Sequence, residues 1–87
     1  MNILFHKSAI ADYQQWASDD ITIFKKISSL IKEITRTPFT GTGKTEPLRG
    51  DLAGFWSRRI NGKHRLVYKV EKDLLIIASC KSHYKEK

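Results

Sequence analysis

Three strand-like segments follow one another in residues 55–81, FWSRRINGKHRLVYKVEKDLLIIASCK. β-Branched and aromatic side chains, which pack well on a pleated surface, are frequent in residues 55–60, 65–70 and 74–81. The turn-forming stretches NG and EKD separate the three segments. Strands joined by such short turns pair antiparallel, so this part of the chain predicts a three-stranded meander.

The start of the chain predicts one strand and a first helix. Residues 2–5, NILF, are apolar enough for a short strand. Ser8 is a suitable N-cap for a helix that carries Ile10, Tyr13 and Trp16 on roughly one side. The stretch SDD at residues 18–20 interrupts this helix.

A second helix is the clearest element in the sequence. Asp19 or Asp20 can cap its start, and Pro38 disfavours helical backbone in the residue before it, so the helix is expected to end near Arg36. Its apolar side chains recur at spacings of three and four residues, as on the buried face of an amphipathic helix. These positions are Ile23, Phe24, Ile27, Leu30, Ile31 and Ile34.

Residues 38–54 form a long connection that is rich in glycine and proline. Long connections in compact domains are usually functional or disordered. Around this connection the order of elements is β-α-α-β-β-β, with neither repeats nor a linker. We therefore expect one α+β domain over residues 1–87, in which two helices pack on one face of a mostly antiparallel sheet.

Alternation along the strands divides their side chains between two faces of the sheet. The face under the helices is expected to take the larger apolar set. Its members are Trp56, Ile60, Leu66, Tyr68, Val70, Leu74, Ile76, Ala78 and Cys80. The opposite, open face then gathers Arg59, Arg65, Lys81 and His83.

The register of the first hairpin decides which arginines share the open face. A strict two-residue turn at Asn61 and Gly62 would place Arg58 opposite Arg65. One further loop residue or a bulge would place Arg59 there instead. The second register is preferred because it agrees with the division of apolar and basic side chains.

Basic residues outnumber acidic ones and concentrate in the second half of the chain. Sixteen Lys and Arg against nine Asp and Glu give a net charge of +7, of which residues 44–87 carry +6 and residues 1–43 carry +1. A surface this basic favours a polyanionic partner, such as nucleic acid, an anionic membrane or an acidic protein. A basic protein without such a partner is the alternative.

Cysteine content and hydropathy indicate where the protein works. The single cysteine, Cys80, cannot form an internal disulfide, as is usual in the reducing cytosol. The first ten residues lack the sustained apolar segment of a signal peptide. The longest wholly apolar run, residues 74–78, is far shorter than the ~20 residues that span a bilayer. We therefore expect a cytoplasmic protein that does not enter a membrane.

Sequence context disfavours a nucleotide-binding loop and a metal site. GTGKT at residues 41–45 lacks the earlier glycine of a phosphate-binding loop, because Pro38 stands there, and the stretch follows a helix rather than a strand. Cys80 and His83 have the spacing of half a metal site, but zinc needs three or four ligands and a regular strand points these two side chains to opposite faces. His6 and His64 are best interpreted as packed or surface histidines, and no nucleophile motif marks a serine. We expect no metal and no cofactor.

The remaining polar residues form the set that metal-free RNA cleavage requires. Glu46 lies in the glycine- and proline-rich connection, arginines lie on the open face, and His83 and Tyr84 end the last strand. In such a reaction a base takes the proton of a 2′-OH, which attacks the adjacent phosphate. An arginine stabilises the charge that builds on phosphorus, and an acid protonates the leaving 5′-oxygen. Glu, Arg and His can fill these roles, and Tyr can stack on a base, but many basic proteins contain such a set.

Several motifs together resemble one family. The stretch RTPFTGTGKTEPLRGDLAGFWSRRINGKHRLVYKV and the later ASCKSHY look like the YoeB branch of the RelE-type ribosome-dependent mRNA interferases. The similarity runs over nearly the whole chain, and the combination of its motifs is specific. The resemblance implies a microbial RNase-like α+β fold and the toxin of a type II toxin–antitoxin pair, which cuts messenger RNA in the ribosomal A site without metal.

The resemblance also implies partners and products. The partners would be mRNA on the ribosome, with the ribosomal RNA of the A site, and an acidic antitoxin protein of the YefM kind. A homodimer stays open. The products would carry a 2′,3′-cyclic phosphate, or its opened 3′-phosphate, and a 5′-OH.

The motifs of the family assign roles to individual residues. Glu46 of TEPL matches the general base, Arg65 of HRLVY the transition-state stabiliser and His83 the general acid. Tyr84 matches the residue that positions the substrate base, and Arg59 of SRRI a second phosphate-contacting arginine. Further basic residues expected to bind RNA are Lys44, Arg49 and Lys81.

Two other functions stay open at this point. One is a basic RNA- or ribosome-binding module without catalysis, although such a binder has no use for a carboxylate that faces phosphates. The other is a gyrase-inhibiting toxin of the ParE kind on a related fold. That function leaves the terminal His–Tyr pair unexplained.

Overall fold

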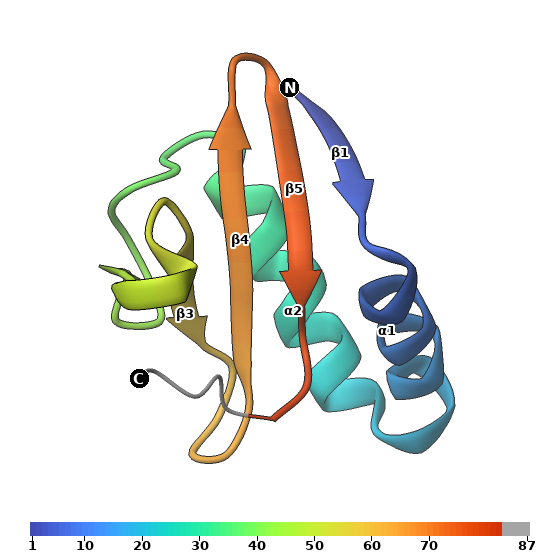
Figure 1. Ribbon diagram of the computed structural model, residues 1–87. Coiled ribbons are helices and arrows are strands. Elements are labelled where there is room, and N and C mark those ends of the chain that lie inside the picture. Colours follow the sequence, from blue (N-terminus) through green and yellow to red (C-terminus); the bar gives the residue numbers. More distant parts are fainter. Residues whose placement is uncertain (83–87) are drawn as a thin grey trace.

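The computed structural model describes residues 1–82 and confirms the predicted order of helices and main strands (Figure 1). The elements are β1 (Asn2–Phe5), α1 (Lys7–Asp19), α2 (Ile21–Ile34), β2 (Glu46–Pro47), a 3₁₀ helix η1 (Gly50–Leu52), β3 (Trp56–Arg59), β4 (Arg65–Glu71) and β5 (Leu74–Ser79). Neither α-helix in this part of the chain is long and apolar enough to cross a membrane.

A five-stranded sheet with the order β1-β5-β4-β3-β2 forms one layer of the fold. β1 runs parallel to β5, and the other neighbouring strands are antiparallel. In Figure 1, α2 passes behind β4 and β5, and α1 lies beside the lower end of β5, below β1. Side chains of both helices share one core with those of β4 and β5. The expected α+β fold, with two helices on one face of a mostly antiparallel sheet, is therefore confirmed. The two-residue strand β2 was not predicted, because it lies in the connection that was expected to be irregular.

The two helices start close to the predicted positions, with one correction. α1 begins at Lys7 after His6, so Ser8 is not its N-cap. The reason is that His6 still donates its backbone N–H to Ile77 of β5, and the helix starts directly where the chain leaves the sheet. Asp20 caps α2 as predicted, since its side chain accepts hydrogen bonds from the backbone N–H groups of Thr22 and Ile23.

The core lies between the helices and the rear face of the sheet. Apolar side chains of both helices pack there against those of β3, β4 and β5. The buried set is Ala9, Trp16, Ile27, Leu30, Ile31, Ile34, Ile60, Leu66, Tyr68, Leu75, Ile77 and Cys80.

The faces of β5 differ from the sequence-based prediction. Leu75 and Ile77 are fully buried under the helices, whereas Leu74, Ile76 and Ala78, which were expected there, are only partly buried. Val67 pairs with Ser79 while its neighbour Tyr68 pairs with Ile77, so Ala78 is an extra residue in the β5 ladder. Such a bulge shifts the alternation by one. Cys80 therefore does reach the core, as predicted, although the residues before it face the other way.

The first hairpin adopts the preferred register, with Arg59 opposite Arg65. Ile60 donates its backbone N–H to the carbonyl of His64, and the side chain of Asn61 accepts from the N–H groups of Lys63 and His64. The turn thus includes more residues than a two-residue Asn–Gly turn. This places Arg59 and Arg65 on the open face of the sheet.

The corrected faces of β5 predict unequal costs for two adjacent leucines. Leu75→Ala removes a fully buried side chain and should lower the free energy of unfolding by about 2–5 kcal/mol. Leu74→Ala removes a partly buried side chain on the other face and should cost clearly less. Urea unfolding of both variants measures the difference. Equal losses, or a larger loss for Leu74→Ala, would contradict the bulged register.

Candidate active site

Three neighbouring strands bring a glutamate, a serine and an arginine together on the open face. Glu46 of β2 pairs with Ser57 of β3, and Arg65 begins β4. The Nη1 atom of Arg65 lies 3.5 Å from Oε1 of Glu46 and donates a hydrogen bond of 3.4 Å to Oγ of Ser57. The sheet therefore places the predicted base beside the predicted transition-state stabiliser, although 19 positions separate them in the sequence.

The two charged groups of this cluster differ in exposure. The side chain of Arg65 is 12% exposed and that of Glu46 is 39% exposed. The Glu46 carboxylate is therefore accessible to a ligand from solvent, whereas the Arg65 guanidinium is mostly enclosed by the neighbouring strands. Ser57, which is fully buried, was not singled out from the sequence. Its position opposite Glu46 depends on β2, which the sequence pattern did not reveal.

Arg59 and Lys44 lie next to each other along the edge of this cluster. The backbone N–H of Arg59 donates to the carbonyl of Gly43, which joins the end of the connection to β3. Arg59 and Lys44 are both exposed, and Lys44 has a positive φ of 54°. Two cations of the predicted RNA-binding set thus lie near the Glu46–Arg65 pair, Arg59 opposite Arg65 in the sheet and Lys44 two residues before Glu46.

The other two predicted RNA-binding residues lie apart from this pair. Arg49 is exposed and directly precedes η1. Lys81 is exposed, but its Nζ atom lies 5.7 Å from the ring centre of Trp16, a residue of α1. Lys81 therefore extends towards the helix side rather than towards Arg65, and it joins the open face less closely than the alternation predicted.

His83 and Tyr84 lie outside the described residues, but the chain just before them is tightly held. Trp16 donates from Nε1 to the carbonyl of Cys80 at 3.0 Å. The backbone N–H of Ser82 donates to Nδ1 of His64 at 2.7 Å, and the backbone N–H of Arg65 donates to the carbonyl of Ser82 at 3.2 Å. The last described residue, Ser82, is therefore held beside His64 and Arg65.

His64 and Arg58 are two residues whose importance the sequence did not indicate. His64 was interpreted as a packed or surface histidine. It is buried, with its ring edge-on to Trp16, and its Nδ1 accepts from Ser82. Arg58 is fully buried on the helix side of β3, directly beside the open-face residues Ser57 and Arg59. The alternation along the strand separated Arg58 from Arg59, but it did not reveal that Arg58 is fully buried.

The structure shows what surrounds the stretches that the sequence context disfavoured as nucleotide and metal sites. The GTGKT stretch connects α2 to β2, so it does not lead from a strand into a helix. Burial raises the pKa of the Cys80 thiol to about 12, and its Sγ donates to the carbonyl of Ala9. Within residues 1–82, no three side chains of His, Cys, Asp or Glu gather in a way that could hold a metal ion.

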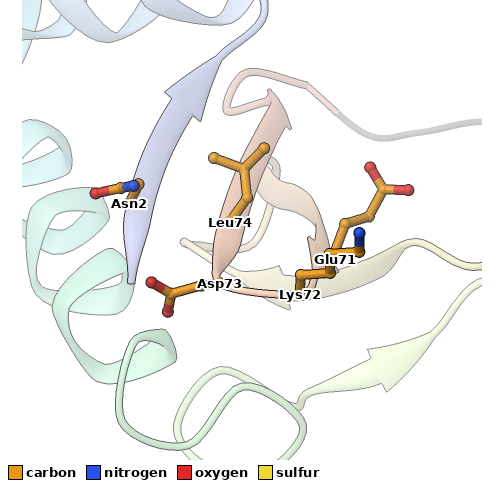
Figure 2. Close-up of a pocket in the computed structure, with 5 residues that line it drawn as sticks. All are labelled: Asn2, Glu71, Lys72, Asp73 and Leu74. Carbon is orange, nitrogen blue, oxygen red and sulfur yellow. The ribbon is translucent and has the colours of Figure 1, made fainter.

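A surface cavity of about 710 Å³ lies away from the cluster (Figure 2). Its lining is formed by Asn2 and by residues of the β4–β5 turn. This turn is at the far end of β4 from Arg65, about 20 Å away at ~3.3 Å per residue. The cavity is therefore not part of the Glu46–Arg65 site.

Comparisons with known proteins agree on one family. The model of the YoeB-like toxin of bacterial type II toxin–antitoxin systems matches residues 5–84. Toxin YoeB of Escherichia coli K12 is 51% identical over 84 residues, which cover 97% of this chain and all of that protein. Toxin YoeB of Streptomyces coelicolor is 50% identical with the same coverage.

Solved structures show the same fold. A YoeB/ParE toxin from Agrobacterium tumefaciens superposes with a TM-score of 0.94 at 44% identity, over 97% of this chain and all of that one. The YoeB–YefM toxin–antitoxin complex of Staphylococcus aureus contains a chain with a TM-score of 0.89 at 46% identity, over 97% of this chain and 98% of that one. The chain described here belongs to the YoeB family of type II toxin–antitoxin toxins.

Proposed function

We propose that this toxin is a ribosome-dependent endoribonuclease that cleaves mRNA in the A site by metal-free acid–base chemistry. The observation that carries the proposal is the Glu46–Arg65 pair, 3.5 Å apart on the open face of the sheet, where Arg65 also donates its backbone N–H to the carbonyl of Ser82. A carboxylate and a guanidinium held together on a basic surface suit phosphate chemistry better than binding alone.

Each step of the proposed reaction has a residue with suitable chemistry. Glu46 removes the proton of the 2′-OH, and the resulting oxygen attacks the adjacent phosphorus. Arg65 stabilises the negative charge that builds on the phosphoryl oxygens. The bond from phosphorus to the 5′-oxygen breaks as His83 donates a proton to that oxygen. The products carry a 2′,3′-cyclic phosphate and a 5′-OH, and Tyr84 stacks on the base beside the cleaved bond.

Arg59 and Lys44 provide positive charge for the RNA backbone next to the reacting phosphate. Both are exposed, and they lie next to each other beside the Glu46–Arg65 pair. Arg49 and Lys81 extend the basic surface further from the site. Contacts of Lys and Arg with phosphates release counterions, so binding to the ribosome should weaken steeply as salt is raised.

We further infer that an acidic antitoxin of the YefM kind covers this surface. The similar toxin of Staphylococcus aureus has been solved as a heterotetrameric complex with YefM and also as a dimer. The charge of residues 44–87 favours an acidic segment, which would fold as it binds over Arg59 and Arg65. Two copies of the toxin in the complex would fit that stoichiometry.

A gyrase-inhibiting function has one observation in its favour. The Agrobacterium relative is described as a YoeB/ParE toxin. Gyrase inhibition, however, gives no role to the carboxylate beside Arg65. Ribosome-dependent cleavage accounts for Glu46, Arg65 and the terminal His–Tyr together.

Cleavage should depend on the ribosome. The protein has a small site whose carboxylate is open to solvent, and the ribosome would hold the RNA in the attacking geometry, an effect worth up to about 7–11 kcal/mol in favourable cases. Primer extension on one messenger, translated or naked, measures the difference. We expect cuts within codons of the translated message only. Equal cleavage of both would contradict the proposal, and inhibition of gyrase without cleavage would support the ParE-like alternative.

Arg65→Ala should abolish most cleavage while the protein stays folded. The substitution removes a donor for the developing charge, a change that typically costs about 10²–10³ in rate. Arg36→Ala, at an exposed position in the turn after α2, is the matched control and should cleave at the wild-type rate. Single-turnover cleavage on programmed ribosomes, with circular dichroism as the folding check, separates the two. A folded Arg65→Ala protein with the wild-type rate would end the assigned role.

His83→Gln should slow the chemical step without weakening ribosome binding. Histidine can donate a proton near neutral pH and glutamine cannot, while both have similar size and can hydrogen-bond. A truncation after Ser82 should behave in the same way, because most of the basic surface remains. The measurements are the single-turnover rate and the ribosome dissociation constant. A wild-type rate for His83→Gln would exclude His83 as the acid.

A further inference from the structure

A buried arginine holds the connection that leads to Glu46. The guanidinium of Arg58 is fully buried on the helix side of β3. Its Nη2 atom donates to the carbonyl oxygens of Thr37 and Thr40, at 2.6 and 2.9 Å, and its Nη1 atom donates to the carbonyl of Thr42 at 3.3 Å. Three backbone carbonyls of the connection between α2 and β2, residues 35–45, thus surround one cation.

The remaining donors of Arg58 meet two side chains that also hold the connection. Nε donates to the hydroxyl of Tyr68 at 3.2 Å, and Nη1 lies 3.4 Å from the carboxylate of Glu33. The hydroxyl of Tyr68 in turn donates to the carbonyl of Pro38 at 2.6 Å. The carboxylate of Glu33 accepts the backbone N–H of Thr42 at 3.0 Å. That hydrogen bond, together with the nearby Arg58 charge, lowers the pKa of the Glu33 carboxyl.

The glycines of the connection make this close wrapping feasible. Gly41 has φ 125°, and a Cβ atom there would collide with the carboxylate of Glu33 and press on Nη1 of Arg58. Gly43 has φ 93°, and a Cβ atom there would lie 3.0 Å from the carbonyl oxygen of Arg59. Only glycine combines these backbone angles with such close approach.

The wrapped connection determines where the catalytic strand begins. From Gly43, whose carbonyl accepts the N–H of Arg59, the chain needs only three residues to reach Glu46. Glu46 then pairs with Ser57, the residue immediately before Arg58. β2 has only two residues, so the sheet gives it few hydrogen bonds, although the N–H of Leu48 just after it also donates to the carbonyl of Phe55. The connection before Glu46 therefore contributes to the position of the strand.

We propose that Arg58 is a positioning residue for the Glu46 carboxylate: it makes no contact with RNA, and it acts by fixing the backbone of residues 37–43. This inference rests on the proposed nuclease function. Arginine is specific here because all five of its N–H donors are used, whereas a lysine ammonium has three. A mismatched buried cation leaves carbonyls of the connection unsatisfied.

Arg58→Lys and Tyr68→Phe test the proposal at two strengths. Arg58→Lys keeps the charge but cannot reach all the partners. Tyr68→Phe removes only the hydroxyl that bridges Arg58 and Pro38, and it serves if Arg58→Lys does not fold. Amide hydrogen exchange of the connection, relative to that of β4 and β5, reports loosening independently of catalysis. We expect faster exchange at Thr42 and Gly43 in both variants.

Cleavage on programmed ribosomes provides the second readout. We expect the single-turnover rate of Arg58→Lys to fall by up to about 10²-fold, as for other small misplacements of a reacting group, while the ribosome dissociation constant stays close to that of the wild type. In a Glu46→Gln background the same substitution should have little further effect, because Arg58 acts through Glu46. An arginine that serves only global stability would lower the rate by the same factor in both backgrounds.

Three results would overturn the inference. They are unchanged exchange in the connection of folded Arg58→Lys, a wild-type cleavage rate despite faster exchange, and equal rate losses with and without the Glu46 carboxylate. A wild-type protein that does not cleave ribosome-bound messenger would instead refute the proposed function. In that case, comparing amide hydrogen exchange of the wild type and Arg58→Lys would still decide whether Arg58 fixes the connection.

Discussion

The pairing of Arg59 with Arg65 across β3 and β4 is the constraint on which the rest of the structure depends. Residues 58 and 59 are both arginine, and the pleat sends them to opposite faces. In this register Arg58 enters the core side and meets the carbonyls of the connection, while Arg59 faces solvent beside Arg65. A shift of the register by one residue would exchange the environments of Arg58 and Arg59. It would remove the contacts of Arg58 on the helix side and those of Arg59 on the open face.

Two segments of irregular backbone then reach the Glu46–Arg65 pair from opposite directions. The connection wrapped around Arg58 brings Glu46 to the open face from one edge of the sheet. On the other side, the bulge at Ala78 turns Cys80 into the core, where its carbonyl accepts from Trp16. The chain beyond is thereby directed to His64 and Arg65. In both segments buried polar side chains fix the irregular backbone, which would keep the groups of the proposed site in place before a substrate binds.

Local sequence patterns predicted the regular elements and failed where distant contacts decide. The spacing of the apolar residues revealed α2, and the division of basic and apolar side chains selected the hairpin register with Arg59 opposite Arg65. The predicted faces of β5 were wrong up to Ala78. The bulge there depends on how β5 pairs with Val67 of β4, which the sequence of β5 does not reveal. β2 was not predicted because it is a strand only by its pairing with Trp56 and Ser57 of β3. The residues of the proposed site were first grouped by their chemistry, and the motifs of the family then assigned a role to each.

Two glutamate–arginine pairs lie on opposite sides of β3 and differ in the burial of their side chains. Glu33–Arg58 and Glu46–Arg65 have almost the same separation, 3.4 and 3.5 Å. The guanidinium of the first pair is fully buried and its other donors are occupied by backbone carbonyls, so losing its partners would leave an unsatisfied charge in the interior. The carboxylate of the second pair is open to solvent. In the proposed reaction, a phosphate of the RNA would take the place of Glu46 at Arg65 and free the carboxylate for the 2′-OH. The Glu33–Arg58 pair, with its fully buried guanidinium, would keep the strand in position.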